Sequence, residues 1–171
     1  MRVNSEILAA LSEATPGLRR YARALGAGAA AAVADGLTQG ALQSVGARLF
    51  ARELRPAGPE EARLEAYIAV TALAARKLVD APPPGPRHPA IVHGLAALPF
   101  EERAVLLLIS LEGFGYDATA RIVGAPRESV LAWLRRARQA LASDAGAPAE
   151  MTETADAPRA HPQAPHLRVV K

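Results

Sequence analysis

The sequence contains no cysteine, which excludes both disulfide bridges and thiolate metal sites. Only 4% of its 171 residues are aromatic, and runs of β-branched residues are nearly absent, so a β-sheet is not expected. Half of the residues are hydrophobic and many of these are alanine, which favours closely packed helices over a bulky core. We therefore predict an all-α fold.

The N-terminus has no apolar signal core, because Arg2, Asn4, Glu6 and Glu13 interrupt its hydrophobic residues. No hydrophobic run elsewhere approaches the roughly 20 residues that a membrane span needs. We therefore expect a cytoplasmic protein with no membrane partner.

Residues that could support catalysis are not grouped in the sequence. There is no glycine-rich phosphate loop, and no Ser/His/Asp grouping lies on a plausible scaffold. Glu101 and Glu102 look like paired acids, but the helix dipole favours acids in a first helical turn, and that explanation suffices. The four histidines lie in or beside irregular sequence, where metal ligands are not held rigidly. We expect no enzyme activity, no small-molecule substrate, no cofactor and no metal site.

The charge of the chain is mildly basic and comes almost entirely from arginine. Lysine plus arginine number 20 against 17 acids, and Lys77 and Lys171 are the only lysines. Arginine suits bidentate contacts to phosphates and bases. This balance permits a nucleic-acid partner without requiring one.

Two changes of composition divide the chain. Residues 80–89 include three consecutive prolines and read as a stiff, extended linker. From about Ser143 the sequence becomes rich in alanine, proline and threonine without an apolar period, which predicts disorder. We therefore predict two small helical domains joined by a Pro-rich linker, with the boundaries 1–79, 80–90 (linker), 91–142 and 143–171 (disordered tail).

The N-terminal domain is expected to contain three or four helices. A short helix over residues 3–13 should be followed by a second one that starts at Pro16, because proline is favoured in a first helical turn. An alanine-rich helix is predicted over residues 27–54, and a stronger amphipathic one over 60–79.

The C-terminal domain should contain three helices separated by two tight breaks. Pro99 can open the first helix, and Gly113 can end it. A two-turn helix follows and is closed by Gly124, and Pro126 stands at the start of the last helix, which runs to about residue 142. The last two helices have the spacing of a helix-turn-helix, which usually meets DNA.

The last helix has an apolar stripe and an arginine-rich outer face. Val130, Leu134, Ala137 and Leu141 form the stripe at 100° per residue. Arginine and glutamine on the outer face could read guanine and adenine edges, and serine could hold a phosphate. An ordinary amphipathic helix with a solvated arginine face is the alternative interpretation. The candidate DNA-binding residues are Arg127, Ser129, Ala132, Trp133, Arg135, Arg136 and Gln139.

About 44 residues, from Leu98 to Leu141, resemble the C-terminal promoter-binding domain of bacterial sigma factors of the extracytoplasmic-function type. The resemblance implies a helix-turn-helix that binds promoter DNA, in a regulator of transcription initiation. It rests on Leu98-Pro99, Arg103, Val105-Leu106-Leu107-Leu108, Leu111-Glu112-Gly113-Phe114, Tyr116, Ala120, Ile122, Gly124, Pro126, Val130, Leu134, Arg136-Ala137-Arg138 and Leu141.

The N-terminal half resembles that family's polymerase-binding domain. Residues 18–25, Leu-Arg-Arg-Tyr-Ala-Arg-Ala-Leu, match its opening. Asp35, Leu37 and Gln39 fall where the family has an acidic helix that binds RNA polymerase core, so the resemblance implies that they contact the polymerase.

The sequence departs from the family in both halves. Gly36 and Gly40 replace two of the expected acids, and each glycine also costs the helix about 1 kcal/mol. In the last helix, Ala132 and Trp133 stand where the family has a hydroxyl and an arginine, and Glu128 would repel phosphate.

Three functions therefore remain open. The first is a divergent sigma factor that binds promoter DNA and RNA polymerase core. The second is a sigma-mimicking regulator that binds an anti-sigma factor and no DNA, similar to the sigma-like half of the alphaproteobacterial general stress regulator. The third is another DNA-binding regulator.

Overall fold

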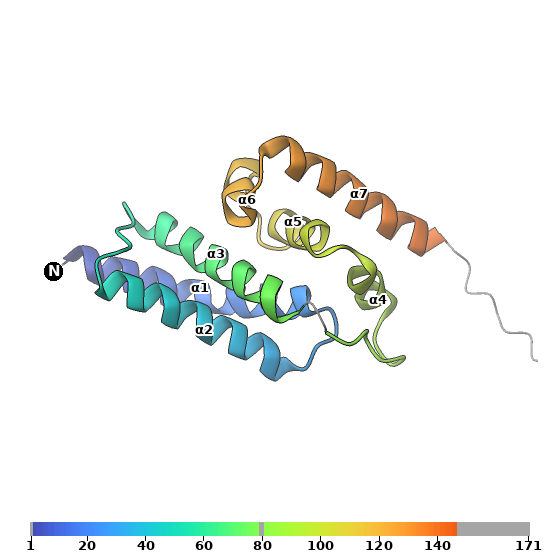
Figure 1. Cartoon of the computed structure of the whole chain (residues 1–171), viewed down its shortest axis with the longest axis horizontal. Helices are drawn as coiled ribbons and strands as arrows, with labels where there is room; N and C mark the ends of the chain where they lie inside the picture. The colour runs from blue at the N-terminus through green and yellow to red at the C-terminus, as the bar shows by residue number, and fades with distance from the viewer. Residues whose placement is uncertain (1, 79–80, 147–171) are drawn as a thin grey trace, which may run out of the picture.

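The structure is a computed structural model that describes residues 2–78 and 81–146. Within these residues the protein contains only helices and no strand, which confirms the predicted all-α class (Figure 1). Seven helices follow one another along the chain: α1 (Arg2–Gly26), α2 (Ala31–Phe50), α3 (Pro59–Lys77), α4 (Ala90–Ala97), α5 (Phe100–Ser110), α6 (Tyr116–Val123) and α7 (Arg127–Gly146).

Helix α1 is continuous through Pro16, so the prediction of two helices that meet there is wrong. A proline inside a helix removes one backbone hydrogen bond, in this case the bond to the Ser12 carbonyl, at a cost of about 3 kcal/mol. Burial of one long face on both sides of the proline offsets this cost. The buried residues recur every three or four positions: Ile7, Leu11, Ala14, Leu18, Tyr21 and Leu25.

Helices α2 and α3 pack against α1 and complete a three-helix N-terminal half. Helix α2 is shorter at both ends than the predicted 27–54, because Ala27 and Gly28 adopt positive φ angles before it and Arg52 adopts one after it. Helix α3 has Pro59 in its first turn and ends at Lys77, close to the predicted 60–79.

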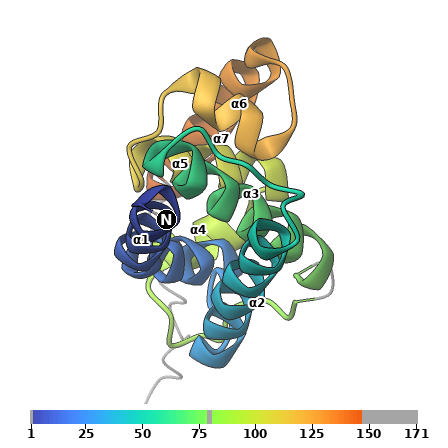
Figure 2. The ribbon, with the colours of Figure 1, turned by 90° about the vertical axis from the view of Figure 1, so that its left-hand side faces the viewer.

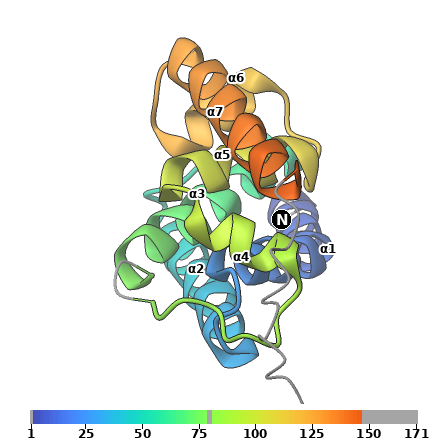
Figure 3. The same cartoon turned by 90° about the vertical axis from the view of Figure 1, so that its right-hand side faces the viewer.

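The Pro-rich segment contains no helix over residues 81–89 and crosses the end of the N-terminal half where α1 leads into α2 (Figure 3). Its Pro84 lies against Gly28 so closely that a Cβ on Gly28 would stand 2.7 Å from the Pro84 Cβ. Gly28 also has a φ of 101°, a region that other residues rarely adopt. Glycine is therefore needed at position 28 for the turn and for the linker.

The C-terminal half has four helices where the sequence predicted three. Helix α4 was missed because it is only eight residues long, follows the prolines directly and contains Gly94. The two predicted breaks are present: Gly113 and Gly124 have φ angles of 73° and 66°, the left-handed conformation that favours glycine after a helix. Helices α6 and α7 form the predicted helix-turn-helix.

Helix α7 continues to Gly146, so the prediction of a disordered tail is wrong for residues 143–146. The predicted end of the last helix near residue 142 was correspondingly too early. The remainder of that predicted tail, residues 147–171, lies outside the described residues.

Helix α5 lies between the two halves and is buried on both sides (Figures 1 and 2). Its Ala104, Leu107 and Leu108 belong to the same buried cluster as the residues of α1, α2 and α3. Its Val105 and Leu106 instead pack with Val130, Leu134 and Ala137 of α7. The three N-terminal helices and the helix-turn-helix are therefore joined through one helix rather than only by the linker.

Candidate functional site

The predicted recognition helix α7 is oriented by its apolar stripe. Val130 and Ala137 are fully buried and Leu134 is 3% exposed, as predicted, whereas Leu141 is half-buried. This packing turns most of the candidate DNA-binding side chains outward. Arg127, Arg135, Arg136 and Gln139 are exposed, while Ser129, Ala132 and Trp133 are half-buried.

Arg136 points back to its own fold. Its Nε donates a hydrogen bond of 2.6 Å to Oε1 of Glu102 in the first turn of α5. The Glu102 side chain is 11% exposed, so this arginine neutralises a largely buried carboxylate. The sequence explained Glu102 by the helix dipole alone, and the structure adds a specific partner for it.

Arg127 is also held by a neighbouring acid. Its Nη1 donates a hydrogen bond of 2.7 Å to Oδ1 of Asp117 on α6, and its guanidinium lies 5.6 Å from the centre of the Tyr116 ring. This pair fastens the start of α7 to α6. Two of the predicted DNA-binding arginines are therefore engaged within the protein.

Several polar side chains of α7 remain open to a partner. Arg135, Arg138 and Gln139 are exposed and make no side-chain hydrogen bond or ion pair within the described residues. Trp133 packs in part against the buried cluster that α7 shares with α5.

The turn after α5 carries a carboxylate that joins the two halves. Glu112, whose side chain is 1% exposed, accepts hydrogen bonds from Nε and Nη2 of Arg20 at 2.9 and 3.1 Å. The hydroxyl of Tyr67 donates a third bond to Oε2 over 2.5 Å. We call Arg20, Tyr67 and Glu112 the interdomain clasp.

The ionisation of the clasp follows from these contacts. The hydrogen bond with Glu112 and its negative charge raise the pKa of Arg20. Burial raises the pKa of Tyr67, and the adjacent Glu112 carboxylate raises it further. Arg20 therefore stays charged and Tyr67 stays neutral, which keeps both groups as hydrogen-bond donors.

Aromatic contacts surround the clasp. The Phe114 ring meets the Tyr67 ring edge-on with 4.8 Å between their centres. The Arg63 guanidinium lies 4.7 Å from the Phe114 ring centre and 5.7 Å from that of Tyr67, within cation–π distance. The Leu-Glu-Gly-Phe turn therefore contacts the N-terminal half through both its acid and its aromatic ring.

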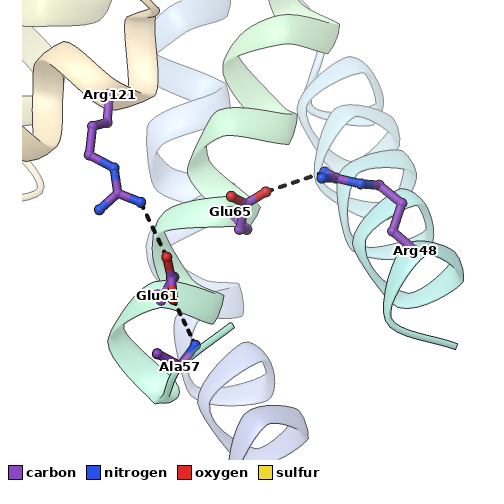
Figure 4. A network of polar contacts seen from close by, with 5 residues as sticks. All are labelled: Arg48, Ala57, Glu61, Glu65 and Arg121. Carbon is purple, nitrogen blue, oxygen red and sulfur yellow. Dashed lines mark hydrogen bonds and ion pairs between the residues drawn. The ribbon is translucent and has the colours of Figure 1, made fainter. Parts of the chain in front are cut away.

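A second polar contact between the halves lies at the start of α3 (Figure 4). Arg121 of α6 donates a hydrogen bond of 3.3 Å to Glu61, and Glu61 also accepts one of 2.7 Å from the backbone N–H of Ala57. The backbone bond is the main reason that the pKa of Glu61 is lowered, and Arg121 adds to the effect. Nearby, Arg48 pairs with Glu65 and ties α2 to α3.

Arg103 makes a third contact between the halves. Its Nη1 donates to the Leu25 carbonyl at 2.8 Å, near the end of α1, and its Nη2 donates to the Leu98 carbonyl at 3.3 Å. The helix α1 terminus leaves carbonyls without intrahelical donors, and Arg103 satisfies one of them. Burial lowers the pKa of Arg103.

The predicted polymerase-binding residues do not share one surface. Leu37 is 1% exposed and lies in the core. Asp35 lies 3.6 Å from Arg19 on α1, and Gln39 is exposed. The apolar period of α2, with Ala34, Leu37, Ala41 and Val45 buried, accounts for the place of Leu37.

The sequence does not show that the clasp residues pair with one another. Arg20 and Glu112 were recognised as parts of two motifs, but 92 positions separate them and nothing local links them. The available signal was an acid in a turn, Leu-Glu-Gly-Phe, with no basic residue between Arg103 and Arg121 to neutralise it.

Within residues 2–78 and 81–146, no cluster of three or more histidine, aspartate or glutamate side chains could hold a metal ion. No helix in the same part of the chain is both long enough and apolar enough to span a membrane.

The sequence comparison agrees with the helix-turn-helix formed by α6 and α7. Residues 89–141 match the family profile described as Sigma-70, region 4. The protein is therefore sigma-factor-like. No curated protein sequence matches the chain.

Among solved structures, the chain is similar to the anti-anti-sigma factor PhyR in its complex with the anti-sigma factor NepR from Bartonella quintana. The TM-score is 0.60 at 18% sequence identity. The match covers 79% of this chain and 49% of that chain, so this protein spans about half the length of PhyR. At this identity the likeness concerns the fold, and it extends over the N-terminal helices as well as region 4.

Proposed function

We propose that this protein is a sigma-like regulator that binds an anti-sigma factor, rather than a sigma factor that reads a promoter. The observation that carries the proposal is the interdomain clasp. Glu112 is buried with three hydrogen bonds from Arg20 and Tyr67, so the N-terminal half and the region 4 half form one preformed surface. A preformed surface reduces the ordering cost of binding a protein that contacts both halves.

The state of the recognition helix supports the same proposal. For Arg136 to contact DNA, its 2.6 Å bond to Glu102 must break and leave a largely buried carboxylate unpaired. Such a loss costs on the order of 1–3 kcal/mol, comparable with what a base contact contributes. PhyR, which shares this fold, is an anti-anti-sigma factor solved in complex with an anti-sigma factor.

Promoter recognition is the second candidate function, and two observations favour it. Residues 89–141 match sigma-70 region 4, and Arg135 and Gln139 on α7 are exposed and unpaired within the described residues. Binding to RNA polymerase core would fall to α2, where Gln39 and Asp35 are accessible but Gly36 and Gly40 replace acids.

The test compares three affinities of the purified protein, measured by titration calorimetry and fluorescence anisotropy. The ligands are NepR as the anti-sigma probe, RNA polymerase core, and a library of promoter-length DNA duplexes. We expect tight binding to the anti-sigma probe. Binding to DNA should be salt-sensitive and independent of sequence, with a Kd for DNA of about 10⁻⁴–10⁻⁶ M.

A matched pair of variants sharpens the test. Glu112→Gln should weaken the anti-sigma complex because it loosens the clasp, whereas Arg135→Ala should leave that complex unchanged. If the protein binds one DNA sequence with nanomolar affinity and Arg135→Ala loses this binding, the promoter-binding function is established instead.

A further inference from the structure

An exposed apolar groove lies between the start of α1 and the end of α2. These two helix ends lie together at one end of the molecule, beside the N-terminus (Figure 1). Phe50, the last residue of α2, is 93% exposed, and Leu8 on α1 is 60% exposed. With Ile7, Gly46 and Leu49 they line a hollow of about 180 Å³. We call these five residues the Phe50 groove. A fully exposed phenylalanine beside further apolar side chains is a mark of an interaction site.

The groove has a basic rim. An adjoining hollow that shares Ile7, Leu49 and Phe50 is also lined by Arg52 and Arg55. Both arginines are exposed and have no ion pair or hydrogen-bonding acid within the described residues. Among the described residues, no acid lines either hollow. A ligand in the groove therefore meets apolar surface in the middle and unneutralised positive charge at one edge.

The backbone beside the groove is strained. Arg52 has a φ of 59°, in the left-handed region that glycine adopts freely and other residues adopt at a cost of about 1 kcal/mol. The Arg52 N–H donates a hydrogen bond to the Leu49 carbonyl, and the Glu53 N–H donates one to the Arg48 carbonyl. Arg52 therefore occupies the position after α2 at which helices commonly have a left-handed glycine. An arginine in this place gives up stability and places a cation at the rim of the groove.

We propose that the Phe50 groove binds an amphipathic helix of a protein partner, with leucine-like side chains in the groove and carboxylates against Arg52 and Arg55. A groove between two helices suits a third helix with anchors at i, i+3, i+4 and i+7. The inference goes beyond the proposed function, because it concerns other residues than the interdomain clasp and helix α7.

The lining of the groove favours a protein over single-stranded nucleic acid. Sites for single strands stack successive bases on several aromatic rings. In the Phe50 groove Phe50 is the single aromatic residue, and Ile7, Leu8 and Leu49 are aliphatic. Aliphatic walls suit the branched side chains of a helix better than the flat faces of bases.

Two glycines of α2 provide a matched pair of variants. Neither Gly46, in the groove, nor Gly36, ten positions earlier on the same helix, has any atom within 4 Å of the place that a Cβ would take. Gly46→Glu therefore fills the groove and repels an acidic ligand without disturbing the core, and glutamate also favours the helix more than glycine does. Gly36→Glu adds the same charge to the same helix away from the groove.

The experiment uses the full chain and a fluorescein-labelled helical peptide with leucine at i, i+3, i+4 and i+7, glutamate on the flanks and alanine elsewhere. Fluorescence anisotropy should show saturable binding that Gly46→Glu and Phe50→Ala each weaken about tenfold or more, while Gly36→Glu does not change it. Arg52→Gly with Arg55→Gln should weaken binding and remove its salt dependence, although Arg52→Gly relieves backbone strain. Circular dichroism confirms that each variant is folded.

Four results of the peptide experiment and its controls would overturn the proposal. These are no saturable binding of the peptide, equal binding of a peptide with lysine in place of glutamate, equal loss in Gly36→Glu and Gly46→Glu, or preferential binding of a single-stranded oligothymidine. Sedimentation could also show that the protein self-associates and that Gly46→Glu abolishes this association. That result would assign the groove to a second copy of the chain and would overturn the proposal. None of these results bears on binding of NepR, so the proposed function is tested separately.

Discussion

Tyr67 on α3 and Glu112 in the turn after α5 share a hydrogen bond of 2.5 Å, which connects the two halves of the protein through one buried carboxylate. Tyr67 is 1% exposed. The position of region 4 relative to the N-terminal helices is therefore fixed by side-chain chemistry and not by the length of the linker.

Tyr67→Phe should lower the free energy of unfolding by about 1.5–3 kcal/mol, the range for a hydrogen bond to a charged group. Urea unfolding followed by circular dichroism measures the change. Tyr116→Phe is the control, because the Tyr116 hydroxyl makes no hydrogen bond within the described residues and the ring is 38% exposed. A control loss as large as that of Tyr67→Phe would contradict the role given to the clasp.

Alanine should have opposite effects at two helical glycines. Gly36→Ala should stabilise the protein by roughly 0.5–1 kcal/mol, because its Cβ meets nothing within 4 Å and alanine is the better helix former. Gly17→Ala should destabilise it, because its Cβ would lie 2.6 Å from the Tyr67 hydroxyl oxygen and 3.0 Å from Oε2 of Glu112. Thermal and urea unfolding of both variants measure the two changes in stability. If both variants were more stable than the original protein, the clasp residues would be able to move away from the added Cβ without loss of stability.

Arg136→Ala should destabilise the fold by about 1–3 kcal/mol, because it leaves the Glu102 carboxylate, 11% exposed, without its partner. Arg135→Ala, one position away on the same helix, should change stability by less than about 0.5 kcal/mol, because Arg135 is exposed and unpaired within the described residues. Urea unfolding again provides the measurement. Similar values for the two variants would mean that the Glu102–Arg136 pair contributes nothing and that Arg136 is free for DNA.

Stability should fall at alkaline pH because of two buried phenols. Burial is the main cause that raises the pKa of Tyr21 and of Tyr67 in the folded protein, whereas both return to about 10 on unfolding. Because the pKa of each phenol is higher in the folded state, its contribution to the free energy of unfolding is complete below about pH 10 and is lost as the pH rises further. Unfolding free energies between about pH 8 and pH 11 should show the fall, and the double variant Tyr21→Phe, Tyr67→Phe should reduce its slope.

The sequence predicted the two helix breaks and the buried face of α7, because residues close together in the sequence determine both. Gly113 and Gly124 were placed correctly because a left-handed residue at a helix end has a strong preference for glycine. The stripe of Val130, Leu134 and Ala137 was correct because helical periodicity alone determines which face can be buried.

Long-range packing accounts for what the sequence did not predict. Pro16 was read as a helix start, but the buried face of α1 extends on both sides of it and outweighs the lost hydrogen bond. Arg136 was assigned to DNA because its outward position is visible in the helical period, while its pairing with Glu102, 34 positions away, is not. Leu37 was assigned to the polymerase from a resemblance, although the period of α2 places it in the core.

The shared core on α1 also constrains the order in which the chain can fold during synthesis. Leu18, Tyr21 and Leu25 are fully buried, and their cluster includes Leu108 and Ile122, which leave the ribosome some 80 to 100 residues later. Domains generally fold as units when enough of the chain has emerged. Part of the apolar face of α1 therefore stays uncovered until residues 108–122 have been made, and during this interval α1 is open to binding by a chaperone.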